Sequence, residues 1–439
     1  MSETIFALSS GAGRAGVAVI RVSGPAVAAV IEALSGRAPP CPRQAALRCL
    51  IDPMDGSEID HALVLYFRAP HSFTGEDVAE FHVHGGLAII ERILGILGRQ
   101  PGCAPAQPDA FTRRAFENGR MDLTQAEAIA DLIDAETEAQ HRQALRQMGG
   151  ALSALYEGWR SRLLADLAHL EADIDFPDED LPGSIAPGVL SDLAHLEREI
   201  AAHLADSHRG ERIRSGVSVA IVGPPNAGKS SLMNALARRD VAIVSQQAGT
   251  TRDVIEVHLD LAGYPVILAD TAGLRDTSDT IEDEGVRRAR ARAERADLKL
   301  LVFDAAAGAP PADLLALRAR QDLLIANKAD LAAAPGVAGT ADLAVSAVDG
   351  AGLPQLLEML GERVAQAFGA SEAPVLTRAR HRAAMEEARD ALYRARHAPG
   401  LELAAEDARL AMRALGRITG RVDVEDLLDV IFKDFCIGK

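Results

Sequence analysis

Hydrophobic residues in the first quarter of the chain fall in short runs. These runs occupy residues 17–22, 62–67 and 78–83, and glycine and proline residues separate them. Short apolar runs with such punctuation are typical of β-strands. The pattern therefore predicts a mixed α/β or α+β domain over residues 1–118.

From Thr124 onwards the apolar spacing becomes helical. Thr124-Gln-Ala-Glu127 has the sequence of a capping box, and apolar residues follow it on one helical face. A second apolar stripe, with intervals of three and four, begins at Leu152, and another helical pattern covers residues 190–204. Residues 119–212 are thus expected to form the first part of an all-α helical domain.

A different alternation begins at residues 217–222, where strand, loop and helix patterns follow one another. This order is typical of a doubly wound α/β sheet, which we expect over residues 213–370. The helical pattern returns over residues 371–439. The simplest arrangement is one helical domain built from both flanks, with the α/β domain inserted into it. Two unrelated helical arms are a less economical alternative, because each arm alone would bury little surface.

Composition narrows the class of protein. Hydrophobic residues make up 48% and charged residues 25%, as in a soluble globular protein. The apolar runs are far shorter than the ~18 residues that span a bilayer, and the first residues lack the pattern of a signal peptide. The cysteines form no CxxC pair and stand at Cys41, Cys49, Cys103 and Cys436. We therefore expect a cytoplasmic chain with reduced thiols and no membrane partner.

The formal net charge of −17 bears on possible partners. Such a chain gains no long-range attraction to nucleic acid from its net charge. An RNA partner would need a local basic patch or a second protein to hold it.

A phosphate-binding motif directly follows the first strand of the predicted α/β domain. Gly223-Pro-Pro-Asn-Ala-Gly228-Lys229-Ser230 fits the pattern G-x-x-x-x-G-K-[ST], and a helical pattern follows. The glycines let backbone N–H groups close around phosphates, Lys229 reaches the outer phosphates, and the Ser230 hydroxyl is a ligand for Mg²⁺.

Two further motifs follow buried strand patterns. In Asp270-Thr-Ala-Gly273 the aspartate would hold Mg²⁺ through water and the glycine N–H would bond to the γ-phosphate. In Asn327-Lys-Ala-Asp330 the final carboxylate can accept two N–H donors from guanine, which adenine does not offer.

Ser346-Ala347 would complete the base pocket, and Thr250-Thr251 would supply a switch threonine to Mg²⁺. Any one short motif is an ordinary loop in most chains, but here all stand in the required order. The sequence thus predicts a P-loop GTPase domain with bound GTP and Mg²⁺. Its predicted nucleotide-binding residues are Asn226, Ala227, Gly228, Lys229, Ser230, Ser231, Ser245, Gln246, Gln247, Ala248, Gly249, Thr250, Thr251, Asp270, Thr271, Ala272, Gly273, Asn327, Lys328, Asp330, Ser346 and Ala347.

The usual hydrolytic glutamine is absent. Ras-type GTPases place it directly after the glycine of D-x-x-G, where this chain has Leu274. An acidic stretch that includes Glu282 follows, and composition alone favours a solvated loop there over a catalytic group. Asn226 stands where a carbonyl oxygen could hold a monovalent cation against the phosphates, although asparagine is also common in such loops for its backbone alone.

Four motifs together resemble one family from end to end. They are Ser72-Phe-Thr-Gly-Glu-Asp77 with His84-Gly-Gly86, Gly249-Thr-Thr-Arg-Asp253, Asp270-Thr-Ala-Gly-Leu-Arg275 and the ending Cys436-Ile-Gly-Lys439. The chain is similar in these to the tRNA-modification GTPases called MnmE or TrmE. The resemblance implies an N-terminal folate-binding and dimerisation domain, a helical domain and an inserted G domain.

The resemblance also implies how hydrolysis is assisted. In the family, G domains of a homodimer meet when GTP and K⁺ bind, and Glu282 aligns with a glutamate that helps to orient the attacking water. Magnesium would be held by Ser230 and Thr251. The implied potassium ligands are Asn226, Ser245, Gln247 and Thr250.

A folate site follows from the same resemblance. Arg21, Glu80 and Lys439 match the family's positions, whereas Arg120 stands where we expect lysine. Charge is retained at that position but geometry is not, because arginine is a planar fork and lysine a point charge.

The implied reaction adds an aminomethyl-type group to C5 of the wobble uridine of certain tRNAs. Its one-carbon unit comes from 5-formyl- or methylene-tetrahydrofolate. The implied partner is an MnmG-type subunit with FAD, in a heterotetramer. That partner would be the main subunit that holds the tRNA, which would ease the difficulty posed by the net charge of −17. Cys436 is either a small apolar residue near a helix end or a participant in the chemistry. A ribosome-assembly GTPase switch without covalent chemistry is the alternative, but it leaves the folate-type region and the Cys436 ending unexplained.

Overall fold

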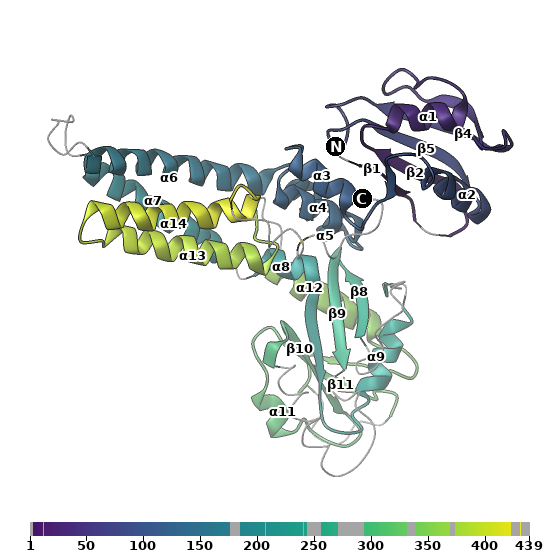
Figure 1. Ribbon diagram of the computed structural model, residues 1–439. Coiled ribbons are helices and arrows are strands. Elements are labelled where there is room, and N and C mark those ends of the chain that lie inside the picture. Colours follow the sequence, from purple (N-terminus) through teal and green to yellow (C-terminus); the bar gives the residue numbers. More distant parts are fainter. Residues whose placement is uncertain are drawn as a thin grey trace, which may run out of the picture. The chain divides into compact units, whose positions relative to one another are not determined.

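The computed structural model describes residues 3–11, 13–175, 185–206, 208–239, 241–243, 256–270, 294–331, 339–368, 374–422 and 431 (Figure 1). Contacts divide the chain into two compact units. Unit 1 comprises Met1–Ala130, Ser153–Ala168 and Ala408–Lys439, and unit 2 comprises Asp131–Leu152 and His169–Asp407. The domain boundaries predicted above stay predictions.

Unit 1 contains a six-stranded sheet with the order β3-β4-β5-β2-β1-β6. The strands pair antiparallel except β1 and β6, which are parallel. The strands are β1 Thr4–Leu8, β2 Ala15–Ser23, β3 Ala46–Ile51, β4 Glu58–Phe67, β5 Val78–Gly85 and β6 Cys103–Pro105, and the first helices are α1 Val27–Ser35 and α2 Leu87–Leu97.

One face of this sheet forms the core of the N-terminal part. On the paired strands β2 and β5, Ile20 lies opposite Phe81, and both are fully buried against α1 and α2. Because side chains alternate across a strand, the next cross-strand pair, Arg21 and Glu80, lies on the other face. The alternation thus sets this polar pair apart from the core.

The first helices after the sheet are α3 Ala110–Glu117 and α4 Leu123–Ile133. The capping box predicted at Thr124 is wrong by two residues. Asp122 Oδ1 accepts from the Gln125 N–H at 3.0 Å, and Gln125 Oε1 accepts from the Asp122 N–H at 3.1 Å. Thr124 lies inside the helix, and its hydroxyl donates to Asp122 Oδ1.

The longer helices confirm the predicted apolar stripe. In α6 (Ala151–Asp175), Leu152, Trp159 and Leu163 are buried, whereas Leu155 is half-buried because Tyr156 takes the core position. In unit 2, α7 and α13 lie side by side (Figure 1). The remaining helices of the all-α part are α5 Glu138–Met148, α7 Ile185–Leu204, α8 Arg209–Ser215, α13 Ala379–Arg396 and α14 Leu401–Thr419.

The second sheet belongs to unit 2 and has the order β12-β11-β10-β7-β9-β8. All neighbours are parallel except β8 and β9. Its strands are β7 Val217–Val222, β8 Glu256–Leu261, β9 Tyr264–Asp270, β10 Leu298–Asp304, β11 Leu323–Asn327 and β12 Leu343–Ala344, with helices α9 Lys229–Ala237, α11 Ala312–Ala316 and α12 Leu353–Phe368. This is the predicted doubly wound sheet.

The strand order places a ligand crevice at β7. Strands β9 and β8 extend the sheet on one side of β7, and β10, β11 and β12 extend it on the other. In open α/β sheets, ligands bind beyond the carboxyl ends of the strands at such a switch point. The phosphate-binding motif predicted from the sequence begins at that end of β7.

One carboxylate joins the two ends of the segment that contains this sheet. Asp131 Oδ1 accepts from Arg214 Nε and from an Arg378 terminal nitrogen, each at 2.8 Å. Arg214 lies in α8, just before β7, and Arg378 directly precedes α13. We call this group of three residues the Asp131 clamp.

Among the described helices, none combines the length and apolar character required to cross a membrane. Within the same residues, Cys41, Cys49 and Cys103 are free thiols.

Candidate guanine-nucleotide and Arg21–Glu80 sites

The phosphate-binding loop comprises residues 223–228 and joins β7 to α9. Gly228 is the N-cap of α9 and has φ +86°. The first N–H groups of the helix therefore lie beside the loop without helical partners, which makes this end of α9 favourable for anions.

Close contacts require glycine at both ends of the loop, Gly223 and Gly228. A Cβ atom on Gly223 would lie 2.0 Å from Val302 O, and one on Gly228 would lie 2.3 Å from Asn327 Nδ2. Val302 belongs to β10 and Asn327 to β11. The loop is thus held directly against the ends of two neighbouring strands, which fixes the position of its N–H groups.

Lys229 spans the loop that it follows. Its Nζ donates to the carbonyl oxygens of Gly223 and Pro224, each at 2.9 Å, and the residue is buried. An ammonium group in this position lies next to the loop's N–H groups, so the residues fit a phosphate-bearing ligand. Ser230 and Asn226 are exposed beside it, and Asn226 has φ +64°.

The predicted base-recognition residues converge from β11 and β12. Asn327 Nδ2 donates to Ala227 O at 2.8 Å, which ties this motif to the phosphate loop. Asn327 Oδ1 is buried and has no hydrogen-bond partner in the described part of the chain. A buried acceptor in that state is expected where a ligand or water supplies the donor.

A carboxylate is held in place at the same end of the sheet. The Ser346 hydroxyl donates to Asp330 Oδ1 at 2.8 Å, and Asp330 itself is exposed. The side chain of Lys328 turns instead to Asp304, with a distance of 2.7 Å from Nζ to Oδ2. This hydrogen bond holds the pKa of Asp304 below its ordinary value, although desolvation opposes the shift.

Several predicted site residues lie outside the described residues. For Asp270 the backbone is described, at the end of β9. The others are Ser245, Gln246, Gln247, Ala248, Gly249, Thr250, Thr251, Thr271, Ala272, Gly273, Glu282, Cys436 and Lys439.

Arg21 and Glu80 form a half-buried ion pair on the face of the first sheet that lies opposite the core. Arg21 Nε and a terminal nitrogen donate to Glu80 Oε1 at 3.1 and 2.9 Å. The guanidinium carbon lies 5.5 Å from the ring centre of Phe73 and 5.7 Å from that of Phe111. His82 Nε2 lies 3.3 Å from the other carboxylate oxygen, Glu80 Oε2.

Arg120 borders the same loop as this pair. Its Cγ and Cδ atoms would lie 3.2 and 3.3 Å from a Cβ atom on Gly75, and Phe73 is two residues away in that loop. The sequence-predicted residues Arg21, Glu80 and Arg120 thus all flank residues 72–77.

Sequence reasoning missed the aromatic and histidine neighbours of the pair. Phe73 stands inside the motif Ser72–Asp77, which by itself indicates no ligand contact, and His82 shares a strand face with Glu80 at a spacing of two. Strand periodicity could have indicated His82. No pattern in the sequence indicated Phe111, which comes from α3.

Comparison with known proteins covers the whole chain. A family model described as "MnmE helical domain" matches residues 123–436, and one described as "GTP-binding protein TrmE N-terminus" matches residues 4–120. A tRNA modification GTPase MnmE from Parvibaculum lavamentivorans is 57% identical over 443 residues, with 100% of both chains covered. Its counterpart from Rhodospirillum rubrum is 55% identical, with 100% of this chain and 99% of that chain covered.

Among solved structures, the G domain of the T. maritima FeoB iron transporter is 27% identical. The match covers 34% of this chain and 98% of that chain, with a TM-score of 0.24. This score is too low to carry a structural argument.

Proposed function

The chain belongs to the MnmE family of tRNA modification GTPases, and from this premise we propose the reaction that it serves. As a member it is a GTPase that takes part in tRNA modification. We infer that it adds an aminomethyl-type group to C5 of the wobble uridine of certain tRNAs. The one-carbon unit would come from a tetrahydrofolate derivative, and an MnmG-type partner with FAD would act with the chain.

The phosphates of GTP would lie on loop 223–228 and the first turn of α9. The N-terminal end of α9, which favours anions, and the ammonium of Lys229 support this placement. Ser230 and Thr251 would hold Mg²⁺, with Asp270 acting through water. Bound Mg²⁺ supplies positive charge to the β- and γ-phosphate oxygens.

Guanine specificity would rest on Asp330. The Ser346 hydroxyl occupies one lone pair of Oδ1, which leaves the remaining oxygen positions of the exposed carboxylate for two guanine N–H donors. Ala347 follows Ser346 on the same side of the base.

Hydrolysis would depend on a cation and a carboxylate, because Leu274 cannot hydrogen-bond to water. Glu282 would orient the attacking water. The exposed, left-handed Asn226 supports a cation site on the phosphate loop. Bound K⁺ would supply the charge that an arginine finger supplies elsewhere. The proposed potassium ligands are Asn226, Ser245, Gln247 and Thr250.

The folate would bind at the Arg21–Glu80 pair. A half-buried carboxylate suits a flat heterocycle with N–H donors. The guanidinium, which lies near two aromatic rings, suits a carbonyl or carboxylate oxygen. Arg120, which borders the same loop, and Lys439 would add positive charge.

The remaining parts of the proposal concern assembly and tRNA chemistry. Two copies of the chain would dimerise through their N-terminal parts and join the MnmG-type subunit in a heterotetramer. Cys436 would act at or near the uridine. The whole assembly would work in the cytoplasm.

The observation that carries the proposal is the co-occurrence of two sites in one chain: the guanine-nucleotide loop and the Arg21–Glu80 pair. The folate half is tested by titrating 5-formyl-tetrahydrofolate into the full chain and into Arg21→Ala/Glu80→Ala. We expect the double variant to lose binding. Arg37→Ala, an exposed arginine between α1 and β3, is the matched control. Equal affinity in all three proteins would refute the folate site.

Deletion of residues 436–439 separates this function from a ribosome-assembly switch. The tRNA-modifying enzyme should lose the wobble-uridine derivative, measured by mass spectrometry of tRNA nucleosides, while GTP hydrolysis continues. An assembly switch would show normal tRNA and altered ribosomal subunits.

A further inference from the structure

A pocket in unit 2 lies apart from the nucleotide loop and from the Arg21–Glu80 pair. Its volume is 110 Å³. One face of α5 forms a wall. The first residues of α6, helix α8, the start of β9 and residues 374, 375 and 377 complete the lining. The lining includes the charged and polar residues Arg142, Gln143, Arg146, Arg209, Tyr264 and Thr377.

Positive charge gathers at the rim of this pocket. Arg142 and Arg146 stand one turn apart on α5, where like charges repel each other. The carboxylate of Glu138 lies 3.6 Å from Arg142, but both side chains are more than half exposed, so this pair neutralises little. Arg209 adds a third guanidinium, and its buried Nε has no hydrogen-bond partner among the described residues.

The floor of the pocket contains a polar group that lacks a partner. Thr377 is 2% exposed, and its Oγ1 makes no hydrogen bond to any described residue. Gln143 Nε2 donates to Gly210 O at 2.9 Å, whereas its buried Oε1 is unpartnered in the same part of the structure. Buried polar atoms in native proteins are almost always hydrogen-bonded, so this floor is suited to a polar ligand.

We propose that this pocket binds one phosphate group of the tRNA backbone. Its volume admits a single phosphate rather than a nucleotide, and guanidinium groups bind phosphate oxygens through paired N–H donors. The Thr377 hydroxyl donates to the buried oxygen. The inference rests on the tRNA part of the proposed function, and it answers the difficulty that a chain with net charge −17 needs a local positive site for RNA.

The position of the pocket connects it to the GTPase part of unit 2. The Ala139 N–H at the start of α5 donates to Gly263 O at 2.9 Å, in the turn between β8 and β9. The strand that starts in the pocket at Tyr264 ends at Asp270. Phosphate contacts fix orientation without reading sequence, so this pocket positions the tRNA rather than selecting it.

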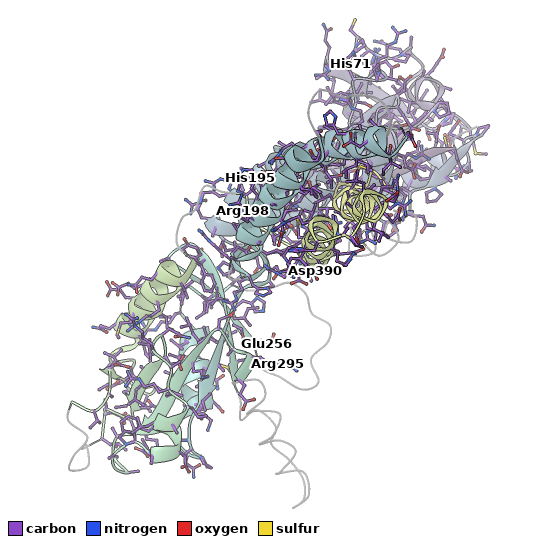
Figure 2. All side chains as sticks on the ribbon, turned by 90° about the vertical axis from the view of Figure 1, so that its left-hand side faces the viewer. His71, His195, Arg198, Glu256, Arg295 and Asp390 are labelled. Carbon is purple, nitrogen blue, oxygen red and sulfur yellow. The ribbon has the colours of Figure 1, made fainter. Side chains whose placement is uncertain are left out.

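The test uses the full chain and the double variant Arg142→Gln/Arg146→Gln. The affinity for tRNA is measured over a range of salt concentrations. Loss of one phosphate contact should lower the slope of log K against log salt by about 1, with weaker binding at low salt. Arg198→Gln is the matched control, since Arg198 is an exposed arginine on α7 (Figure 2) and is not among the residues that line the pocket. It should leave the slope unchanged.

Inorganic phosphate provides a second arm at constant ionic strength. All proteins are first saturated with GDP, so that nucleotide occupies loop 223–228. Phosphate should then raise the unfolding temperature of the parent chain and of Arg198→Gln, but not that of the double variant. Thr377→Val should fold normally, because it removes an unpartnered hydroxyl, and should also lose the phosphate effect.

The outcomes separate the two levels of the proposal. Stabilisation by phosphate without a change in the tRNA slope would mean a free-anion site and would overturn the tRNA assignment. No phosphate effect on the parent chain would overturn the pocket itself. If the parent chain modifies no tRNA in nucleoside analysis, the proposed function fails, whatever the pocket binds.

Discussion

Base recognition depends on a few atoms around Asp330. The hydrogen bond from Ser346 keeps the carboxylate in one orientation before any ligand binds. Asn327 couples the same segment to the phosphate loop through Ala227 O. The base and phosphate ends of the site are therefore connected by side-chain contacts and not only by the sheet.

Asp330→Asn should change the preferred base. The amide replaces one acceptor by a donor, so one guanine N–H loses its partner, whereas xanthine offers a carbonyl oxygen there. We expect GTP affinity to fall by roughly 10²-fold, since hydrogen bonds to charged groups contribute about 1.5–3 kcal/mol each. Titration with GTP and xanthosine triphosphate checks this, with Asp313→Asn in α11 as a control. Unchanged GTP affinity would contradict the assignment.

Potassium should accelerate hydrolysis strongly. Charge that develops on the phosphate bridge must be neutralised, and charge donors of this type contribute about 10³–10⁵ in rate in related enzymes. We expect GTP hydrolysis to be many-fold faster in K⁺ than in Na⁺ at equal ionic strength. Asn226→Ala should remove the difference, and Glu282→Ala should slow turnover without weakening GTP binding. Equal rates in the two salts would show that the charge comes from elsewhere.

For single residues, the sequence predicts which residues belong to the site better than it predicts which atoms they contact. The loop glycines and Lys229 stand in a recognisable order, but the Gly228–Asn327 approach depends on how β11 pairs in the sheet. Arg21 and Glu80 were assigned through a family resemblance alone. That they face each other across β2 and β5 follows from strand register, and Phe111 reaches the Arg21 guanidinium from α3.

Among the elements, α6 offers a clean test of helix propensity. Gly158 is exposed within this helix, and a Cβ atom added there would meet nothing within 4 Å. Gly158→Ala should raise the free energy of unfolding by about 0.5–1 kcal/mol, because alanine has less backbone freedom to lose. Urea-induced unfolding measures this change in the free energy of unfolding. Gly228→Ala is the opposite case, since its Cβ would collide with Asn327 Nδ2, and it should impair nucleotide binding. Destabilisation by Gly158→Ala would contradict the prediction.

The start of α4 shows why element boundaries are hard to predict. Two capping patterns overlap there, Asp122-x-x-Gln125 and Thr124-x-x-Glu127, and both have suitable residues. The structure uses the first, while Thr124 and Glu127 are buried. Both residues are locally acceptable N-caps for α4, and burial of Thr124 in the folded chain selects Asp122. The sequence pattern alone does not show which residues become buried.

For the whole molecule, the order of motifs predicted the doubly wound sheet and its insertion between helical segments. The short apolar run at residues 323–326, directly before Asn327, lies in an interior strand of the sheet, because buried parallel strands are apolar on both faces. The pattern could not predict how contacts group the long helices. Helix α6 is continuous in sequence, yet its residues divide between the two compact units.

The inserted segment should be dispensable for folding of the helices. A chain in which a short Gly/Ser linker replaces residues 217–374 should keep its far-UV helical signal and unfold cooperatively, because the Asp131 clamp still joins the flanking residues. Asp131→Ala in the shortened chain should lower its unfolding temperature. Loss of helical signal in the shortened chain itself would show that the sheet is required.

The Asp131 clamp also makes the chain between Arg214 and Arg378 a closed loop in the polymer sense. The entropic cost of closing a loop grows only with the logarithm of its length. Doubling the number of residues between Arg214 and Arg378 therefore raises the free energy of loop closure by about 0.6 kcal/mol. The stability of the helical part therefore depends little on the length of the segment between these two arginines. Insertions that lengthen the GTPase segment can accumulate there during evolution without loosening the helical scaffold.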